Sequence, residues 1–412
     1  MNLRSIALTA ALAAVPVVAA AVSVSTTKRV KTEVREGPGN YYPLVCVLAK
    51  GARVDILEAG PAWASVKAEG KGGKGAAKGW IAKNCLAEKA AARSAMDLDL
   101  AGNGIQTSAA SVAAAVRGFA THYGRATAKS LAGLQAIKQP FFTVEEYLAF
   151  KRPPPTPAPS ATDGLADRYG LLLADYDTTL EEDGIGTGMS ARVAAEGLVN
   201  DAAKLRYLNM LAALLAESSA AYDHPFRVYL TKGKQVNAVA VPGGTIFLSR
   251  PLVAACRDEA QLAAVIAHEM THVILRHGLK ELKARATEMR AEQSMDELDA
   301  MTGDAPDADA EELQNWASDA YEVIHKPRLQ GLEEEADAGA VLLLARAGYD
   351  PKAVAEMISR VGDAVSGQAD NPFSGMDYKK RAAAAREAAA LLPDRGARNK
   401  DRFDRAMPAP AR

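Results

Sequence analysis

Three of the six histidines fall within ten residues of one apolar segment, VIAHEMTHVILRHG, at positions 265–278. If this segment is a helix, His268 and His272 lie one turn apart on the same face, so both imidazoles can reach one metal ion. Glu269 points about 100° around the helix, near an open coordination position. The pattern H-E-x-x-H predicts two zinc ligands and a general base for the water that attacks a peptide bond. The alternative is a buried helix whose histidines make ordinary hydrogen bonds.

The third histidine of this segment does not fit the same face. His277 lies nine positions after His268, on the opposite side of the helical wheel, so a continuous helix would turn it away from the ion. We expect it at the helix end or beside a ligand, with Gly278 as the C-cap. A metzincin would need glycine at position 275 and histidine at 278. The chain has Leu275 and Gly278 there, which excludes that class.

A third ligand is expected from the carboxylates of LEEEADAGAVLLL, which opens a second apolar helix at Leu332. Of the three adjacent glutamates, only Glu333 has an acid one helical turn later, at Asp337. Metal-bound histidines usually donate their second N–H to such a carboxylate. We therefore predict Glu333 as the ligand and Asp337 as the group that orients a histidine. Glu334 and Glu335 suit a solvated helix start, where carboxylates complement the helix dipole.

The elements that must position these residues are helices with a small sheet. PFRVYL reads as a strand, and VNAVAVPGGTIFLS reads as a strand, a tight turn and a strand. Helical periodicity begins at about residue 161, after a proline-rich connector at 152–160. Residues 89–150 are alanine-rich and helical, with a capped helix starting at Thr143. The expected fold class is α+β, with a mainly helical, zincin-type peptidase domain at 161–395 after a helical segment and linker at 89–160.

The N-terminal part has a different character. Residues 28–88 alternate in short strands with turns, which predicts a small β-barrel. Residues 1–21 have the layout of a cleaved secretory signal peptide; the alternative is an uncleaved membrane anchor. Export would permit a disulfide between Cys46 and Cys85. At the other end, residues 396–412 are polar and arginine-rich, and predict a disordered tail.

The balance of acidic and basic residues limits the classes of partner that the chain can bind. With 49 basic and 50 acidic residues, the net charge is -1, which argues against binding nucleic acid through a basic face. The expected partners are protein or peptide substrates.

Two family resemblances follow from these motifs. The order N-A-x-A-x-P-G-G, H-E-x-x-H, E-x-x-A-D and GYDP, between Leu208 and Leu392, resembles the gluzincin endopeptidases of metallopeptidase family forty-eight. This resemblance implies one zinc per chain, an active-site edge strand at 237–244, and the following roles. Its ligands are His268, His272 and Glu333, its base is Glu269, its supporting acid is Asp337, and its substrate-binding residues are Asn237, Ala238, Val239 and Ala240.

The N-terminal barrel resembles the bacterial SH3-like domain, through residues that match its turn and tryptophan positions: Arg35, Gly37, Pro38, Gly51, Trp63, Gly79 and Trp80. This resemblance implies a cell-wall or envelope-protein ligand for residues 28–88. The tryptophans suit the core of the barrel equally well.

One departure from the peptidase family concerns its Ser/Thr-His-Pro segment. Ser374 and Arg381 fit that frame, but Gly375 replaces the histidine and Met376 the proline. Tyr378 is a candidate oxyanion donor in its place; the alternative is a packed tyrosine.

Together these features predict an exported zinc metalloendopeptidase of the periplasm or cell envelope, which cleaves envelope proteins in protein quality control. One alternative is an envelope-targeted binding or chaperone-like module with little proteolysis. Another is a hydrolase of cell-wall peptides. Membrane association through an uncleaved N-terminus also stays open.

Overall fold

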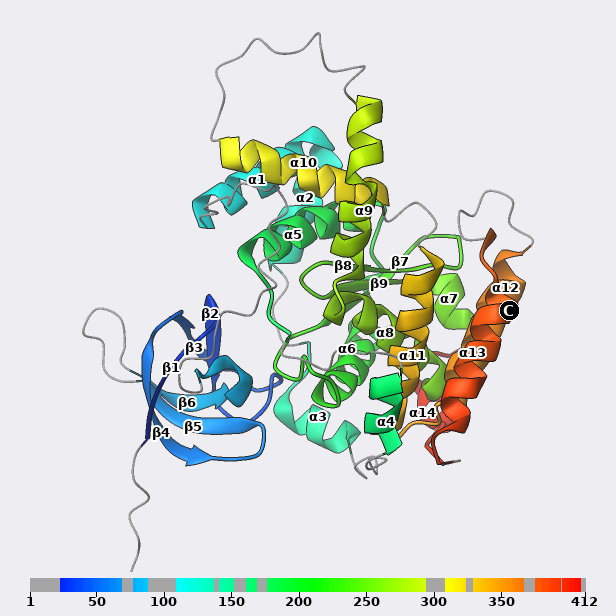
Figure 1. Cartoon of the computed structure of the whole chain (residues 1–412), viewed down its shortest axis with the longest axis horizontal. Coiled ribbons are helices and arrows are strands. Elements are labelled where there is room, and N and C mark those ends of the chain that lie inside the picture. Colours follow the sequence, from blue (N-terminus) through cyan, green and yellow to red (C-terminus); the bar gives the residue numbers. More distant parts are fainter. Residues whose placement is uncertain are drawn as a thin grey trace, which may run out of the picture. The chain divides into compact units, whose positions relative to one another are not determined.

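The computed structural model describes residues 23–68, 77–87, 109–136, 141–151, 161–168, 176–293, 308–323, 329–366, 375–393 and 395–408 (Figure 1). The chain divides into two compact units. The first comprises Met1–Pro38 and Val45–Ala90, and the second Gly39–Leu44 and Ala91–Arg412. The predicted signal peptide and the proline-rich connector lie outside the described residues. Among the described helices, none is long and apolar enough to cross a membrane.

The first unit is a sheet of six short strands with the order β1-β4-β5-β6-β2-β3. The strands are β1 (Ser23–Thr26), β2 (Lys31–Arg35), β3 (Leu44–Ala49), β4 (Arg53–Ala59), β5 (Trp63–Ala68) and β6 (Ala77–Ala82), followed by the short helix η1 (Lys83–Cys85). Val34, Val66 and Ile81 are fully buried between them. A Cβ at Gly79 would lie 2.6 Å from the Arg35 carbonyl oxygen, so only glycine permits this strand crossing. These strands fit the predicted barrel, and its SH3-like ligand stays a prediction.

The predicted disulfide between Cys46 and Cys85 is absent from the structure. Cys46 lies on β3, at one end of the strand order. Cys85 lies in η1 and is joined through its carbonyl to Lys28, just after β1, the strand at the other end of that order. Both cysteines belong to one small unit, as predicted, but their thiols are free.

The second unit is mainly helical, in agreement with the predicted α+β class (Figure 1). Before its sheet come α1 (Ala109–His122), α2 (Arg125–Ala136), α3 (Val144–Phe150), α4 (Ala161–Arg168), α5 (Leu180–Ala195) and α6 (Ala202–Glu217). After the sheet come α7 (Arg250–Ala255), α8 (Glu259–Ile274), α9 (His277–Gln293), α10 (Ala308–Val323), α11 (Gln330–Arg346), α12 (Lys352–Val365), α13 (Tyr378–Ala390) and α14 (Lys400–Ala406). Thr143 starts α3 with the expected capping box, because its side chain and that of Glu146 bond each other's backbone N–H groups.

The sheet of this unit has the order β7-β9-β8. Strand β7 (Arg227–Thr231) runs parallel to β9 (Thr245–Ser249), and β8 (Ala238–Val241) is antiparallel to β9. Gly243 and Gly244 make the turn between β8 and β9 with φ of 78° and 85°, a conformation that favours glycine. In the described part of the chain, β8 pairs with β9 alone, so its other edge carries no strand.

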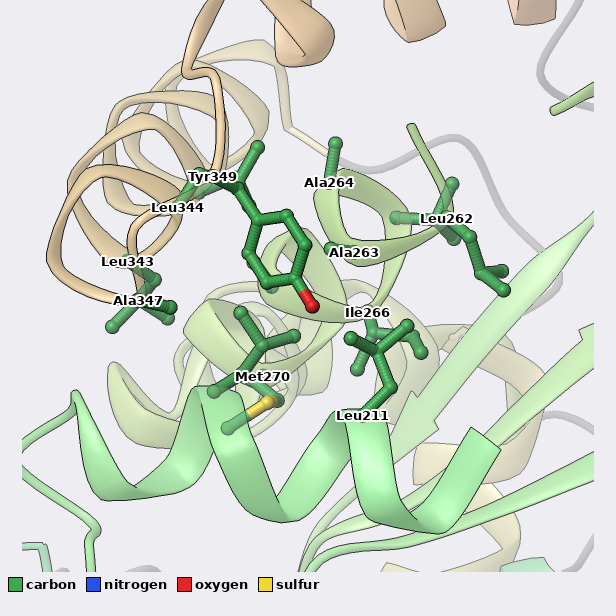
Figure 2. Close-up of a cluster of buried hydrophobic side chains, with 14 of the residues drawn as sticks. Leu211, Leu262, Ala263, Ala264, Ile266, Met270, Leu343, Leu344, Ala347 and Tyr349 are labelled. Atoms are coloured by element: carbon green, nitrogen blue, oxygen red, sulfur yellow. The ribbon is translucent and has the colours of Figure 1, made fainter. Parts of the chain in front are cut away.

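The core of the second unit surrounds α8 and α11. Figure 2 shows Leu211 of α6 and Met270 of α8 with Leu343 and Leu344 of α11, packed around the ring of Tyr349. The two helices approach closely because α11 has Gly339 at the crossing, where a Cβ would lie 2.3 Å from Cγ2 of Thr271. This packing fixes α11 against the histidine-bearing helix.

The predicted disordered tail is ordered from residue 395 to 408. Helix α14 buries Phe403, and Met407 just after it is buried as well. Arg402 forms an ion pair with Glu259, which is fully buried in the first turn of α8. The polar residues of this segment form ion pairs with the start of α8. Local sequence patterns do not reveal such long-range pairs.

Candidate metal centre

Three predicted ligands converge at the middle of α8. The Nε2 atoms of His268 and His272 lie 3.0 Å apart. The carboxylate of Glu333 on α11 lies 3.4 Å from Nε2 of His268 and 3.3 Å from Nε2 of His272. A tetrahedral zinc ion with bonds of about 2.0–2.2 Å holds its ligand atoms about 3.3–3.6 Å apart. The three side chains therefore fit a zinc site, as a His-His-carboxylate donor set should.

The other ring nitrogen of His268 is held by Asp337, as predicted from the spacing on α11. The Nδ1–H group donates to Oδ1 of Asp337 over 2.9 Å, which leaves Nε2 as the lone-pair donor toward the ion. Arg381 of α13 completes this arrangement. Its guanidinium donates to both oxygens of Asp337, at 2.8 and 2.9 Å, and lies 3.0 Å from the Glu333 carboxylate.

The charges at the centre support one another. Burial alone would lower the pKa of His268, but its hydrogen bonds to Asp337 and Glu333 raise that pKa to about 10. Burial alone would raise the pKa of Glu333, but the positive charge of His272 and the hydrogen bond from His268 hold it well below its ordinary value. A cation at the same Nε2 atoms competes with these protons, so metal binding is linked to proton release.

His277 lies beside the ligand His272, as one of the two expectations had it, but it does so because the helix is interrupted and not as part of a continuous α8. Helix α8 ends at Ile274, and Arg276 takes a left-handed conformation with φ of 54°, which interrupts the helix before α9 begins at His277. The fully buried His277 therefore folds back, with its Nδ1 2.9 Å from Nδ1 of His272 and its Nε2 3.2 Å from the Glu335 carboxylate.

The predicted cap at Gly278 is wrong for the same reason, because Gly278 lies inside α9 and the interruption occurs at Arg276. Glu335 is likewise more than a solvated residue, since it accepts from His277. Glu334 does behave as expected of a surface acid, with bonds to Lys380 and Gln330 at 2.8 and 3.0 Å.

A cavity of about 120 Å³ adjoins the three ligands and brings the predicted base beside them. Glu269 is 6% exposed and lines this cavity together with Asn237, Ala238 and Val239, three of the four predicted substrate-binding residues. The fourth, Ala240, is buried in the main core instead. The wall beyond them is apolar and comes from α7, α8 and α12, through Leu252, Val265, Met357, Ile358, Val361 and Val365.

Tyr378 satisfies parts of both sequence interpretations. Its ring lines the same cavity, packs on the bare backbone of Gly362, where a Cβ would lie 2.6 Å from the tyrosine Cβ, and lies 5.5 Å from Cζ of Arg381. Burial raises the pKa of Tyr378 to about 12, so its hydroxyl keeps its proton at neutral pH. Gly375 is exposed, and Met376 joins the cavity wall.

Sequence reasoning missed the contacts of Arg381 with Asp337 and Glu333, and the contact of His277 with Glu335. Arg381 was visible only as a position in a family frame. The only local hint of the His277 contact is the pair Arg276-His277 directly after α8. The contact depends on the positive φ of Arg276, and neither glycine nor proline stands there to indicate it.

Comparison with known proteins finds a family match for the region that holds the site. Residues 202–392 match the model of peptidase family M48. The beta-barrel assembly-enhancing protease of Yersinia pestis is 31% identical over 178 residues, covering 41% of this chain and 35% of the relative. That of Escherichia coli is 30% identical over 211 residues, with shares of 46% and 42%. The mitochondrial metalloendopeptidase OMA1 of Schizosaccharomyces pombe is 26% identical over 162 residues, with shares of 39% and 45%. The chain thus spans less than half the length of these relatives.

Proposed function

Because residues 202–392 match the model of peptidase family M48, we propose that this chain is a zinc-dependent metalloendopeptidase of the cell envelope that cleaves envelope proteins in quality control. The observation that carries the proposal is the convergence of His268, His272 and Glu333 next to Glu269, at a cavity that also exposes part of β8. One zinc per chain would be held by these three ligands. When bound, zinc supplies a Lewis acid that polarises the scissile carbonyl and eases the deprotonation of water.

The residues around the ion have separate tasks. The Glu269 carboxylate accepts the proton of the attacking water and passes it to the leaving amine. Asp337 and Arg381 keep His268 and Glu333 in place, so that the base and the ligands need little reorganisation during the reaction. Tyr378 is a candidate donor to the oxyanion, because its protonated hydroxyl belongs to a ring that lines the cavity.

An extended peptide suits this site better than a folded protein. The open edge of β8 can pair with a substrate strand through backbone hydrogen bonds, beginning near Asn237. An apolar cavity of about 150 Å³ accommodates benzene, so the cavity of about 120 Å³ beside Glu269 suits one apolar side chain. Misassembled envelope proteins expose such segments, and the names of the Yersinia and Escherichia relatives refer to β-barrel assembly. The first unit would bind a cell-wall or envelope-protein ligand.

The test compares the purified chain with its Glu269→Gln variant on unfolded casein. We expect about one zinc per chain in both proteins and a loss of casein cleavage of at least about 100-fold in the variant. Glu334→Gln is the matched control, because Glu334 bonds only Lys380 and Gln330 among the contacts seen here, and it should cleave like the wild type. A wild type without zinc, or equal cleavage by Glu269→Gln, would refute the proposal. Cleavage of purified peptidoglycan but not of casein would favour the cell-wall hydrolase instead.

A further inference from the structure

The two histidine ligands are held at their outer nitrogens in different ways. His268 is bonded directly to a buried carboxylate, Asp337. His272 meets another imidazole instead, that of His277, with 2.9 Å between the two Nδ1 atoms. His277 in turn lies 3.2 Å from the Glu335 carboxylate through its Nε2. Each series of hydrogen bonds begins at a carboxylate of α11, because Asp337 and Glu335 are two residues apart on that helix.

This order of contacts allows one proton arrangement when His272 binds a metal. The Nε2 atom of His272 must offer its lone pair to the ion, so its proton is on Nδ1. That N–H group donates to Nδ1 of His277, which must then act as an acceptor. The proton of His277 is consequently on Nε2, where it donates to Glu335. The tautomers of both rings are thus fixed by one carboxylate at the surface end of the chain of hydrogen bonds.

We propose that His277 and Glu335 are positioning residues for the metal centre, which set the tautomer and the ring orientation of His272 and thereby the affinity for zinc. The proposal rests on the metal site of the proposed function, and assigns to it two residues outside the ligand set. His277 is suited to this task because it is fully buried and has no solvent to substitute for its two partners.

The positive φ of Arg276, which interrupts the helix just before His277, supports the same assignment. A non-glycine residue in the left-handed region carries a conformational cost, which persists only where the surroundings hold it. Nε of Arg276 donates to Glu182 on α5 over 2.8 Å, and a second nitrogen of the guanidinium donates to the backbone of Asp177. These contacts hold the one turn of chain that brings His277 back against His272.

The test measures the zinc dissociation constant of the full chain by competition with a chromophoric chelator. His277→Phe keeps a ring but removes the acceptor, so zinc binding should weaken about 10- to 100-fold, the usual effect of losing an outer partner of a ligand. His277→Asn places an amide oxygen near the lost Nδ1 and should restore most of the affinity. His122→Asn, at an exposed histidine of α1, is the matched control.

A second pair of variants keeps the test decisive if His277→Phe does not fold. Glu335→Ala should weaken zinc binding, by less than His277→Phe, whereas Glu334→Ala on the same turn should leave it unchanged. The visible spectrum of the cobalt-substituted proteins gives an independent readout, and we expect a changed ligand field in His277→Phe and Glu335→Ala only.

A merely structural role would lower the melting temperature of the metal-free protein and leave the zinc dissociation constant and the cobalt spectrum unaltered. That result overturns the inference, as does equal zinc affinity in Glu335→Ala and Glu334→Ala. Failure of the wild type to bind zinc would instead contradict the proposed function.

Discussion

Replacing Arg381 by methionine should destabilise the metal-free protein and at the same time tighten its hold on zinc. The guanidinium is 5% exposed and faces two buried carboxylates, Asp337 and Glu333, which are 2% and 6% exposed. The pKa of His268 is raised to about 10, and the positive charge of His272 lowers the pKa of Glu333. The metal-free centre therefore balances its two carboxylates with protonated imidazoles as well as with Arg381. Methionine fills part of the same volume but removes the positive charge that contacts both carboxylates.

The expected loss follows from that charge count. Breaking a buried pair by removing one partner costs about 3–5 kcal/mol, a large share of the roughly 5–15 kcal/mol that keeps a domain folded. Zinc brings two positive charges to the same carboxylates, and where it displaces fewer than two imidazole protons it offsets part of the lost charge. The destabilisation should therefore be smaller in saturating zinc. By linkage, each 1.4 kcal/mol that zinc restores must appear as about tenfold tighter zinc binding by Arg381→Met.

Urea unfolding followed by far-ultraviolet circular dichroism suits this test, because the α-helices of the described residues all belong to the second unit. Wild type and variant are compared without metal and with saturating zinc, and zinc affinity is measured separately. Arg386→Met is the control on the same helix, since Arg386 is exposed and bonds Ser359. It should change the unfolding free energy by less than about 0.5 kcal/mol.

Two results would refute this reasoning. A loss below about 1 kcal/mol in the metal-free protein would mean that the buried carboxylates find another counter-charge or take up a proton. An equal loss with and without zinc, together with weaker zinc binding, would mean that Arg381 acts by shaping the site and not by its charge.

Two further predictions concern packing and pH. Gly339→Ala should cost about 1–3 kcal/mol, because its Cβ would lie 2.3 Å from Cγ2 of Thr271; Thr271→Ala in the same chain should recover part of this loss, and a double-mutant cycle in urea measures the coupling. Burial lowers the pKa of His224 to about 4, although its Nε2 bonds the Gly243 carbonyl. Between these pH values the unfolded chain binds a proton at His224 that the folded chain does not bind. The free energy of unfolding should therefore decrease by about 3 kcal/mol as the pH falls from about 6.5 to about 4. His224→Gln should flatten that part of the stability profile, and an unchanged profile would contradict the assignment.

The sequence predicts the convergence of the three ligands and of Asp337 because, in a regular helix, the spacing of two residues determines whether they share a face. One turn of α8 places His268 and His272 on one face, and one turn of α11 places Glu333 and Asp337 on another. The strands β7, β8 and β9 were predictable from alternating apolar residues and from Pro242-Gly243-Gly244. The start of α3 was predictable from the capping box at Thr143.

The errors arise where the chain leaves such regularity or where partners are distant in sequence. The helix is interrupted at Arg276, which is not a glycine although its φ is positive. The sequence therefore predicted the helix end at Gly278, two residues later. Arg381 meets Asp337 across 44 residues, and Arg402 meets Glu259 across 143. Local composition does not predict ion pairs at that separation, and the tail therefore resembled a disordered segment.

The three acids at positions 333, 335 and 337 all project from one rigid helix, α11. A slide of this helix along its axis by a single residue would remove a ligand of the ion and the supports of both histidines in one movement. Loading with metal and docking of α11 onto α8 are for that reason expected to be a single cooperative event. In hydrogen exchange, the amides of α11 and of the middle of α8 should gain protection together on addition of zinc, and a half-assembled centre should not accumulate.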